Sequence, residues 1–172
     1  YKDYLTAIVQ GYGDKVKYWE IWNEPNLDKY WLGTPHDYVT LLQASYEAIK
    51  AADPHAKVLG AALSCNDYQH IKLLYDLGAK PYFDIVSVHP YCNPWDPQEP
   101  GDAQKGFYPT ARKVLDVMVS NGDENKDVWF TELAWAKDWS YWGGVTAENQ
   151  ADYMKTSYQM ANDNWQQVKT YV

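Results

Sequence analysis

Two periodicities alternate along the whole chain, and this alternation limits the folds that it can adopt. Short apolar runs rich in β-branched and aromatic residues are each followed by a longer stretch in which apolar residues recur at helical spacing. This order is typical of β-α-β units, whose strands are parallel. A run that is apolar at nearly every position, such as Ile85-Val86-Ser87-Val88, indicates a parallel sheet covered on both faces. The sequence therefore predicts an α/β fold.

The expected elements follow one another regularly. Strands are predicted at residues 16–22, 57–63, 83–89 and 127–133, with the start of a fifth at 168–172. Helices are predicted at residues 3–13, 35–52, 68–77 and 109–120, with a last one that ends near residue 164. Asp53 and Pro54 end the second helix, and Thr146 caps the last one. No linker, low-complexity tract or fixed-period repeat interrupts this order, so residues 1–172 are expected to form one domain.

Periodicity alone does not distinguish an open doubly wound sheet from a barrel. The loops after the predicted strands are long, aromatic and polar, whereas the loops after the helices are short. In a β/α barrel the loops after the strands form the active-site face, and about 250 residues are needed to close eight strands. With four full strands and part of a fifth, this chain would form only part of a barrel.

Charge and composition exclude some partners and favour others. The formal net charge is −8 and no basic run is present, which opposes nucleic-acid binding because that depends on Lys and Arg. No apolar run approaches the roughly 18 residues that span a bilayer, so no membrane segment is expected. The 172 residues include nine Trp and sixteen Tyr, several of them in segments otherwise rich in Gly, Pro, Asp and Asn. Such rings suit protein interfaces and sugar rings alike, and they indicate a binding cleft.

The cysteines and the N-terminus leave the compartment open. Cys65 and Cys92 each follow a predicted strand and are interpreted as free thiols. A disulfide between neighbouring strand ends is the alternative, and it would suit an oxidising compartment. The chain has no signal peptide and is expected to be truncated at its N-terminus, so secretion is compatible with the sequence.

A first candidate catalytic residue lies where an apolar strand ends in an Asn-Glu-Pro turn. Glu24 is thereby placed at the carboxyl end of a strand. Pro25 favours an extended backbone at Glu24. Trp22 and Asn23 can supply apolar and hydrogen-bonding surroundings that raise the pKa of a carboxyl group for acid catalysis. The alternative is a turn carboxylate that caps the next helix.

A second candidate, Glu132, interrupts the apolar run from Val128 to Trp135. A charge at this position in a buried parallel strand is costly unless it is paired or functional. Two glutamates at strand ends, three β/α units apart, match the needs of glycoside hydrolysis. That reaction requires a protonated acid at the glycosidic oxygen and an ionised carboxylate near the anomeric carbon.

These motifs resemble those of clan A of the glycoside hydrolases. In the clan the acid/base lies in Asn-Glu-Pro after the fourth barrel strand, as in residues 23–25, and the nucleophile follows the seventh strand, as in Thr131-Glu132. The segment from Trp19 to Leu27, followed by Tyr30-Trp31, is most similar to glycoside hydrolase family 39, which contains β-xylosidases and endoglycosidases. The resemblance implies an incomplete (β/α)8 TIM barrel, from about the fourth strand to the start of the eighth.

The resemblance also implies an enzyme, a retaining glycoside hydrolase. Glu132 would be the nucleophile and Glu24 the acid/base in a double displacement on β-linked oligo- or polysaccharides. The alternative function is a non-catalytic carbohydrate-binding or assembly-dependent partial barrel. Glu20 is interpreted as a structural charge paired with a Lys or Arg.

Four further residues are implied as substrate-binding by their position in the family motifs. Asn23 corresponds to the asparagine that binds the sugar 2-hydroxyl group. His89 and Tyr91 correspond to a pair beside the nucleophile, and Trp135 to a sugar-stacking ring. Weaker cleft candidates are Trp31, Trp95, Trp139 and Trp142.

The expected partner is a carbohydrate, without nucleic acid or membrane. Because barrel strands are missing, self-association or a missing barrel portion is also expected. No cofactor is implied. His36, His55 and His70 lie in or beside predicted helices without the spacing of metal ligands, so no metal is expected.

Overall fold

The computed structural model describes residues 1–99, 107–137 and 143–171. Within them, five parallel strands form one sheet in the order β1-β2-β3-β4-β5. The strands are β1 (Tyr18–Glu20), β2 (Lys57–Ser64), β3 (Ile85–His89), β4 (Asp127–Phe130) and β5 (Val168–Tyr171). The helices are α1 (Lys2–Tyr12), α2 (Pro35–Ala52), α3 (Tyr68–Asp76), the 3-10 helix η1 (Lys80–Tyr82), α4 (Phe107–Ser120) and α5 (Ala147–Asn164). The α/β prediction is confirmed.

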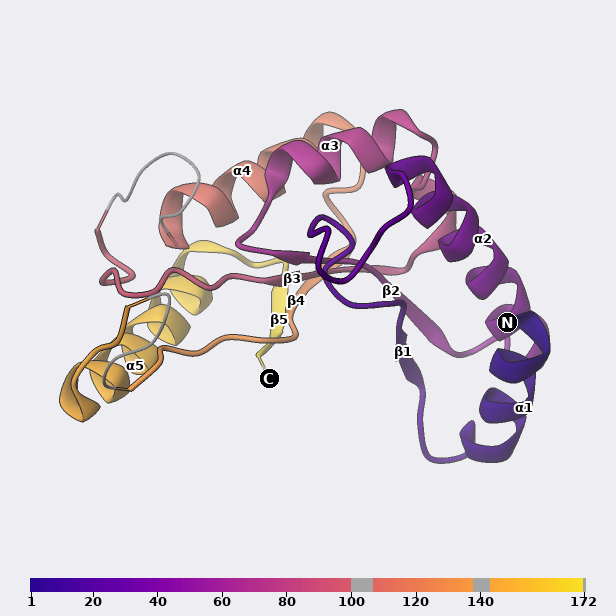
Figure 1. Cartoon of the computed structure of the whole chain (residues 1–172), viewed down its shortest axis with the longest axis horizontal. Coiled ribbons are helices and arrows are strands. Elements are labelled where there is room, and N and C mark those ends of the chain that lie inside the picture. Colours follow the sequence, from indigo (N-terminus) through magenta and orange to yellow (C-terminus); the bar gives the residue numbers. More distant parts are fainter. Residues whose placement is uncertain (100–106, 138–142, 172) are drawn as a thin grey trace.

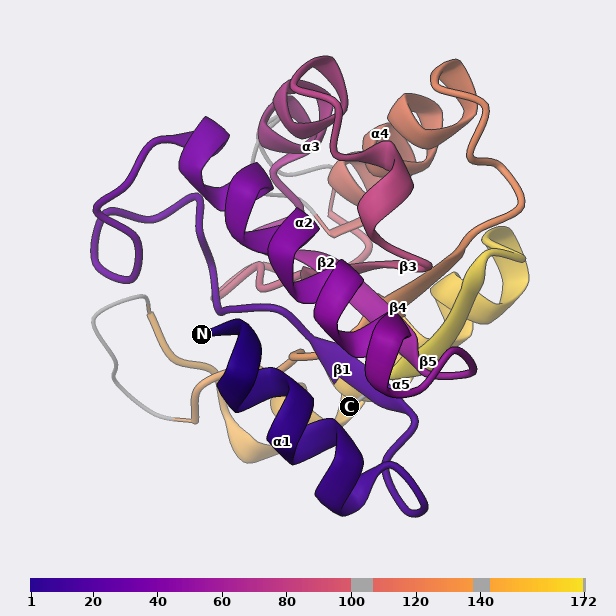
Figure 2. The same cartoon turned by 90° about the vertical axis from the view of Figure 1, so that its right-hand side faces the viewer.

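The helices lie on one side of the sheet. Figure 1 shows α1 to α5 following one another in an arc around the strands. In Figure 2, α1 and α2 pack side by side in front of β1 and β2. Each strand pairs with the next strand along the chain, so the carboxyl ends of all five strands point to the same end of the sheet.

Local capping signals fix the helices that the sequence located best. The Thr34 hydroxyl accepts from the Asp37 backbone N–H while the Asp37 carboxylate accepts from the Thr34 backbone N–H, which is a capping box at the start of α2. Thr146 caps α5 by accepting from the Asn149 backbone N–H, as predicted. Three strands are shorter than predicted, since β3 begins only at Ile85, β1 ends at Glu20 and β4 ends at Phe130. Beyond those points the chain leaves the ladder to form the loops that carry the two glutamates.

The register separates two faces of the sheet. Val58, Val86 and Val128 point toward the helices and are buried. Residues of the opposite face, called the inner face below, alternate with them. The inner face is formed by Tyr18, Glu20, Leu59, Ile85, Ser87, Asp127 and Trp129. On this face Tyr18 of β1 and Trp129 of β4 meet with ring centroids 4.6 Å apart, across the two strands between them.

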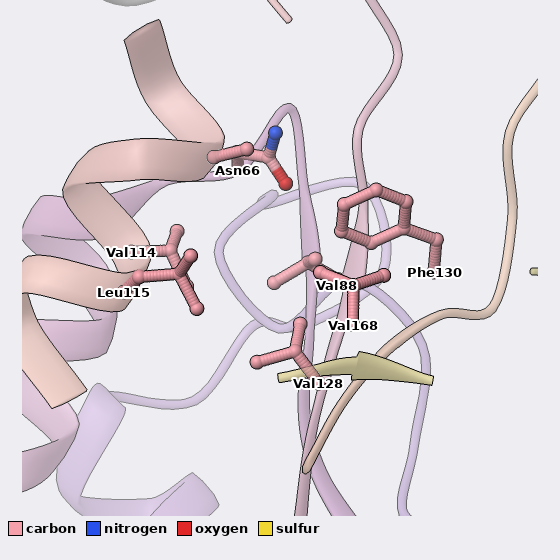
Figure 3. Close-up of a pocket in the computed structure, with 8 residues that line it drawn as sticks. Asn66, Val88, Val114, Leu115, Val128, Phe130 and Val168 are labelled. Atoms are coloured by element: carbon pink, nitrogen blue, oxygen red, sulfur yellow. The ribbon is translucent and has the colours of Figure 1, made fainter. Parts of the chain in front are cut away.

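The space between α4 and the sheet is tightly filled. Val88, Val128 and Phe130 line a small apolar pocket there, and Asn66 lies at its end (Figure 3). The pocket is too small to hold a water molecule. Its lining is therefore packing for the core and offers no room for a ligand.

Gly60 of β2 is required by the packing of the sheet against its helices. A Cβ atom at this position would lie 2.9 Å from the Cβ of Phe83 and 3.3 Å from Cδ2 of Leu42. We expect Gly60→Ala to lower the free energy of unfolding by about 1 to 3 kcal/mol, the usual cost of overpacking. Denaturant titration measures this change.

Gly11→Ala in α1 is the matched control, because its added Cβ meets nothing within 4 Å. There the same substitution should raise the free energy of unfolding by about 0.5 to 1 kcal/mol through its helix propensity. Equal stabilities for the Gly60→Ala variant and the wild type would contradict the packing described for β2.

Two further expectations concern the cysteines and the membrane. Within the described residues no disulfide joins Cys65 and Cys92; Cys65 is exposed and Cys92 is buried. Of the helices in the described residues, none has the length and apolar character needed to cross a membrane.

Candidate active site

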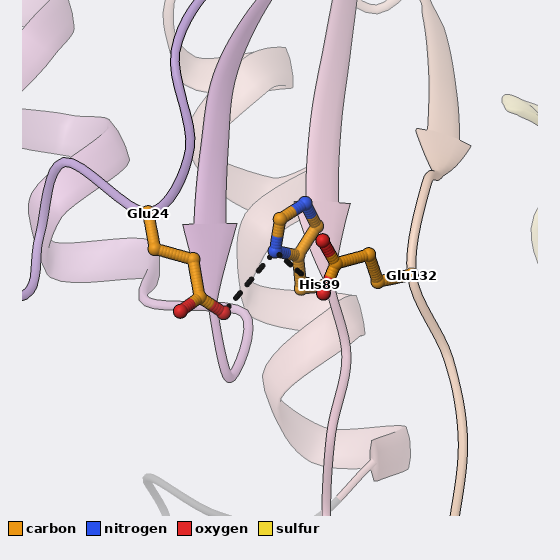
Figure 4. Close-up of side chains that lie close together, drawn as sticks. All are labelled: Glu24, His89 and Glu132. Carbon is orange, nitrogen blue, oxygen red and sulfur yellow. Dashed lines mark hydrogen bonds and ion pairs between the residues drawn. The ribbon is translucent and has the colours of Figure 1, made fainter. Parts of the chain in front are cut away.

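Two glutamates and a histidine meet at the carboxyl ends of β1, β3 and β4. One carboxylate oxygen of Glu24, one ring nitrogen of His89 and one carboxylate oxygen of Glu132 all lie within 4.8 Å of one another. His89 Nδ1 lies 3.2 Å from Oε1 of Glu24 and 3.6 Å from Oε2 of Glu132. Figure 4 shows the imidazole between the two carboxylates. The structure thus brings together the three residues, as their positions at strand ends predicted.

The backbone of Glu24 is held by an irregularity in β2. The register between β2 and β3 shifts between Ala61 and Leu63, and Ala61 and Ala62 have φ angles of 86° and 47°. The Ala62 carbonyl accepts from the Glu24 backbone N–H at 2.9 Å. Non-glycine residues with such φ angles cost on the order of 1 to 3 kcal/mol each and persist where surrounding bonds fix them. The strained segment of β2 therefore positions the main chain of Glu24.

The expectation of an extended backbone at Glu24 was wrong. Glu24 has φ of 45°, in the left-handed region. Its N–H is bound to Ala62, and its own carbonyl accepts from the Leu27 N–H at 3.0 Å. These two bonds, one on each side of the residue, outweigh the local preference that Pro25 imposes.

His89 is buried, with 1% of its surface exposed. Its carbonyl accepts from the backbone N–H groups of Cys65 and Tyr91, each at 2.8 Å, which fixes the residue at the end of β3. Nδ1 faces the carboxylates, whereas Nε2 is buried without a hydrogen-bond partner among the described residues. An ionised carboxylate only accepts hydrogen bonds, so Nδ1 carries the hydrogen when Glu24 is ionised.

The pKa of Glu24 is shifted opposite to the sequence-based expectation. Burial is the largest single influence and raises the pKa, but hydrogen bonds from His89 and Ser64 lower it, as do the charges of His89 and Lys29. The net result is a pKa below the ordinary value. The expectation that Trp22 and Asn23 raise this pKa was therefore wrong, because Glu24 has neighbours that lower it and that the sequence did not reveal.

This shift links Glu24 to acid stability. A carboxyl group whose pKa is lower in the folded state stabilises the fold above its unfolded pKa, which is about 4.3, and loses that contribution as the pH falls through the folded value. We expect Glu24→Gln to lose less stability than the wild type when the pH is lowered from about 5 to about 3. Denaturant titrations at a series of pH values measure the difference. The exposed Glu148→Gln serves as the surface control, and parallel curves for the Glu24 variant and the wild type would contradict the shift.

Glu132 is more open to solvent, and its side chain is 43% exposed. The Tyr91 hydroxyl donates to Oε2 of Glu132 at 3.0 Å. Burial raises the pKa of Tyr91, and so does its hydrogen bond to Glu132, so the hydroxyl keeps its hydrogen at neutral pH. Tyr91 therefore orients the Glu132 carboxylate as a hydrogen-bond donor.

Among the residues that the structure describes, Glu20 does not pair with the Lys or Arg that was expected. Its Oε1 instead accepts from the Thr131 hydroxyl at 2.7 Å. Thr131 directly precedes Glu132 in the chain. The bond therefore ties β1, which leads to Glu24, to the loop that carries Glu132, on the inner face of the sheet.

The remaining substrate-binding candidates differ in their exposure. Asn23 is half-buried beside Glu24. Trp135 is only 1% exposed; its indole N–H donates to the Trp95 carbonyl at 2.9 Å, and its ring packs against Tyr153. A sugar cannot reach the faces of such a ring, so the stacking role expected for Trp135 is not met in this geometry.

The weaker aromatic candidates also differ in their exposure to solvent. Trp95 is 45% exposed. Trp31 is half-buried, and its ring makes an edge-to-face contact with that of Trp22, with centroids 5.4 Å apart. Trp139 and Trp142 lie outside the described residues.

Sequence reasoning missed the part that Ser64 and Asn26 play. The Ser64 side chain contributes to lowering the pKa of Glu24. The Asn26 side chain binds the backbone of Ser64 twice, donating to its carbonyl at 3.2 Å and accepting from its N–H at 3.1 Å. Ser64 was recognisable as the first polar residue after an apolar strand, as were Glu24 and His89, but no residue pattern indicated its partner.

The same three residues offer donor atoms for a metal ion. Glu24, His89 and Glu132 are the one such group found among the described residues, and none of His36, His55 and His70 belongs to it. Metal binding through Nδ1 would require His89 to give up the hydrogen that it donates to Glu24. The hydrogen bond to Glu24 and a metal ion therefore exclude each other at Nδ1.

Comparison with known proteins assigns the family. Residues 3–98, which are more than half of the chain, match the model of glycosyl hydrolases family 39. The chain belongs to this family. It is 32% identical over 103 residues to a β-xylosidase of Geobacillus stearothermophilus and 36% identical over 90 residues to one of Caldicellulosiruptor saccharolyticus. These matches cover 54% and 49% of this chain but only 20% and 18% of the relatives, so the chain spans a small part of their length.

Solved structures from glycoside hydrolase families 39 and 44 share the fold of this chain. A family 39 glycoside hydrolase from Bacteroides cellulosilyticus superposes with a TM-score of 0.78 at 23% identity, over 99% of this chain and 36% of that one. A monomeric β-xylosidase from Caulobacter crescentus gives 0.72 at 22% identity, over 99% and 37%. A family 44 xyloglucanase from Paenibacillus polymyxa gives 0.69 at 15% identity, over 99% and 46%. The chain thus folds as part of a TIM barrel, as the family 39 resemblance implied.

Proposed function

We propose that this chain carries the catalytic pair of a retaining β-glycosidase. Glu132 attacks the anomeric carbon as the bond to the leaving oxygen breaks, and Glu24 donates its proton to that oxygen. Glu24 then takes a proton from water, which attacks the anomeric carbon and releases Glu132. The observation that supports this proposal is the approach of the two carboxylates to within 4.8 Å. Retaining enzymes separate these groups by about 5 to 5.5 Å, whereas inverting enzymes need about 6.5 to 9.5 Å.

Glu24 has to take up a proton from solvent before it can act as the acid, and binding of the substrate favours this protonated form. Burial raises the pKa of Glu24, but its interactions with His89, Ser64 and Lys29 hold it below the ordinary value. A sugar in the cleft excludes water, which adds to the burial that already raises this pKa. Once Glu132 has formed the covalent intermediate it carries no charge, which favours the ionised form of Glu24 that acts as a base.

Three neighbouring residues would support the two glutamates without forming or breaking covalent bonds themselves. His89 bridges the two carboxylates and sets their separation. Tyr91 fixes Oε2 of Glu132 through its 3.0 Å hydrogen bond, which leaves the other oxygen for the attack. Asn23, half-buried beside Glu24, would bind the sugar 2-hydroxyl group.

A β-xyloside is the first substrate to test, because the two sequence relatives are named β-xylosidases. We expect the protein that carries this chain to hydrolyse aryl β-xylosides, and NMR of the first-formed sugar to show the β-anomer. Parallel assays with other aryl β-glycosides define the sugar specificity. Sugar binding in a calorimeter with no hydrolysis of any β-glycoside would instead support the non-catalytic carbohydrate-binding function.

A further inference from the structure

We propose that Glu20 is a positioning residue for the reaction, and that it holds the nucleophile Glu132 in place through its hydrogen bond to Thr131. This inference rests on the proposed function, because it concerns the rate at which Glu132 attacks. The Thr131 hydroxyl donates to Oε1 of Glu20 at 2.7 Å, although the two residues are 111 positions apart in the chain. In this role Glu20 acts through Thr131 and makes no contact with the substrate.

Thr131 is held from two directions, which fixes the start of the loop that carries Glu132. β4 ends at Phe130. One residue later, the Thr131 backbone N–H still donates to the Val88 carbonyl of β3 at 3.2 Å. The Thr131 side chain is bound to Glu20 of β1. The residue before the nucleophile is thus tied both to the neighbouring strand and to the strand that leads to the proposed acid.

A second contact joins the same two strands closer to their amino ends. The rings of Tyr18 and Trp129 meet with centroids 4.6 Å apart, and each ring lies two residues before a member of the Glu20–Thr131 hydrogen bond. Both contacts pass across β2 and β3. Ser87 of β3 is in register with Trp129, and its short side chain leaves this space to the larger ones. The ring contact and the hydrogen bond are together called the inner brace below.

The inner brace connects the backbones that carry the two catalytic groups. Glu24 follows Glu20 in the chain, and Glu132 follows Thr131. Retention requires the two carboxyl groups to lie about 5 to 5.5 Å apart, and a displacement of about 1 Å can lower a rate by about 10²-fold. Tyr91 binds the carboxylate of Glu132, whereas the inner brace fixes the main chain from which that side chain extends. Loss of the hydrogen bond should therefore slow the attack.

Thr131→Val is the least disruptive test, because valine has nearly the shape of threonine without its hydroxyl. Glu20 is exposed in this chain, so the experiment uses the protein that carries the chain. We expect Thr131→Val and Glu20→Ala each to lower kcat/KM by about 10- to 100-fold, through kcat rather than KM. Thr131→Ser and Glu20→Gln keep a donor and an acceptor, and should recover most of the lost rate. Thr40→Val on the exposed side of α2 is the matched control, because its hydroxyl donates to the His36 carbonyl at 3.0 Å.

Three readouts distinguish positioning of Glu132 from a general loss of stability. The rate of trapping by a 2-deoxy-2-fluoro β-glycoside reports the attack directly, and it should fall by about the same factor as kcat/KM. The loss should be equal for dinitrophenyl and alkyl β-glycosides, since Glu132 attacks both. The double variant Thr131→Val, Glu20→Ala should lose no more than the larger single loss, because both changes remove the same bond.

Trapping of Thr131→Val at the wild-type rate would overturn the inference. Losses that multiply in the double variant would overturn it as well, since they would show that the two residues act independently. If Glu20→Ala does not fold, the comparison of Thr131→Val with Thr131→Ser decides alone. Failure of the proposed function gives a different result, in which the wild type itself hydrolyses no β-glycoside and takes up no label.

Discussion

Glu132→Ala is expected to lower kcat for β-glycoside hydrolysis by about four orders of magnitude or more. Loss of an activated nucleophile removes the whole double displacement, and such losses reach about 10⁶-fold in other enzymes. The loss should be similar for good and poor leaving groups, because the attacking carboxylate is needed for both. Initial rates with dinitrophenyl and alkyl β-glycosides measure this.

Glu24→Ala should behave differently. General acid catalysis contributes about 10²- to 10⁴-fold, so alkyl glycosides should lose that much activity. Dinitrophenolate leaves without a proton, so its release in the first step should be nearly unchanged. The exposed Glu124→Ala is the control for loss of a carboxylate. If Glu24→Ala and Glu132→Ala gave the same dependence on the leaving group, the assignment of the two roles would be wrong.

Residues 1–172 expressed alone are expected to be poorly stable, weakly active or inactive, and prone to self-association. In the described residues, β1 and β5 are the edges of the sheet and leave backbone groups unpaired. The inner face, which fills the centre of a complete barrel, is only partly covered here: Leu59 and Ile85 are buried, but Tyr18 is 51% exposed. Net stabilities are about 5 to 15 kcal/mol, and each fully buried large side chain contributes about 1.5 to 3 kcal/mol, so a few uncovered side chains remove the margin.

Thermal unfolding and light scattering of this polypeptide test the expectation. We expect a broad transition, association that grows with concentration, and little turnover above the Glu132→Ala background. A sharp transition of a monomer, with Glu132-dependent turnover comparable to that of a complete family 39 enzyme, would contradict it.

The sequence predicted helices better than strand ends for a physical reason. The limits of α2 were predictable because Thr34, Pro35 and Asp53 act within their own segment. The end of β4 depends on pairing with β3 and β5, which lie far away in the sequence, so Phe130 could not be recognised as its last residue. The bulge at Ala61 and Ala62 was equally hidden, because it follows from tertiary contacts with Glu24 and Ser87.

In the candidate site, too, some features were predictable from the sequence and others were not. Glu24, His89 and Glu132 were predictable as neighbours because parallel strands end at one edge of the sheet. Their environments were not predictable. Ser64 reaches Glu24 from a different strand and helps to lower its pKa, and Trp135 turns into the core rather than toward the cleft. Residue type and spacing indicate which groups meet, whereas hydrogen-bond donors and ring orientation depend on packing.

The most direct test of the central claim is identification of the covalent intermediate. A 2-deoxy-2-fluoro β-glycoside of the preferred sugar slows breakdown of the glycosyl-enzyme, so the labelled protein can be digested and its peptides sequenced by mass spectrometry. The proposed mechanism predicts one sugar attached to the side chain of Glu132, and no label in Glu132→Ala. A label on Glu24, or turnover with inverted product and no labelled peptide, would contradict it.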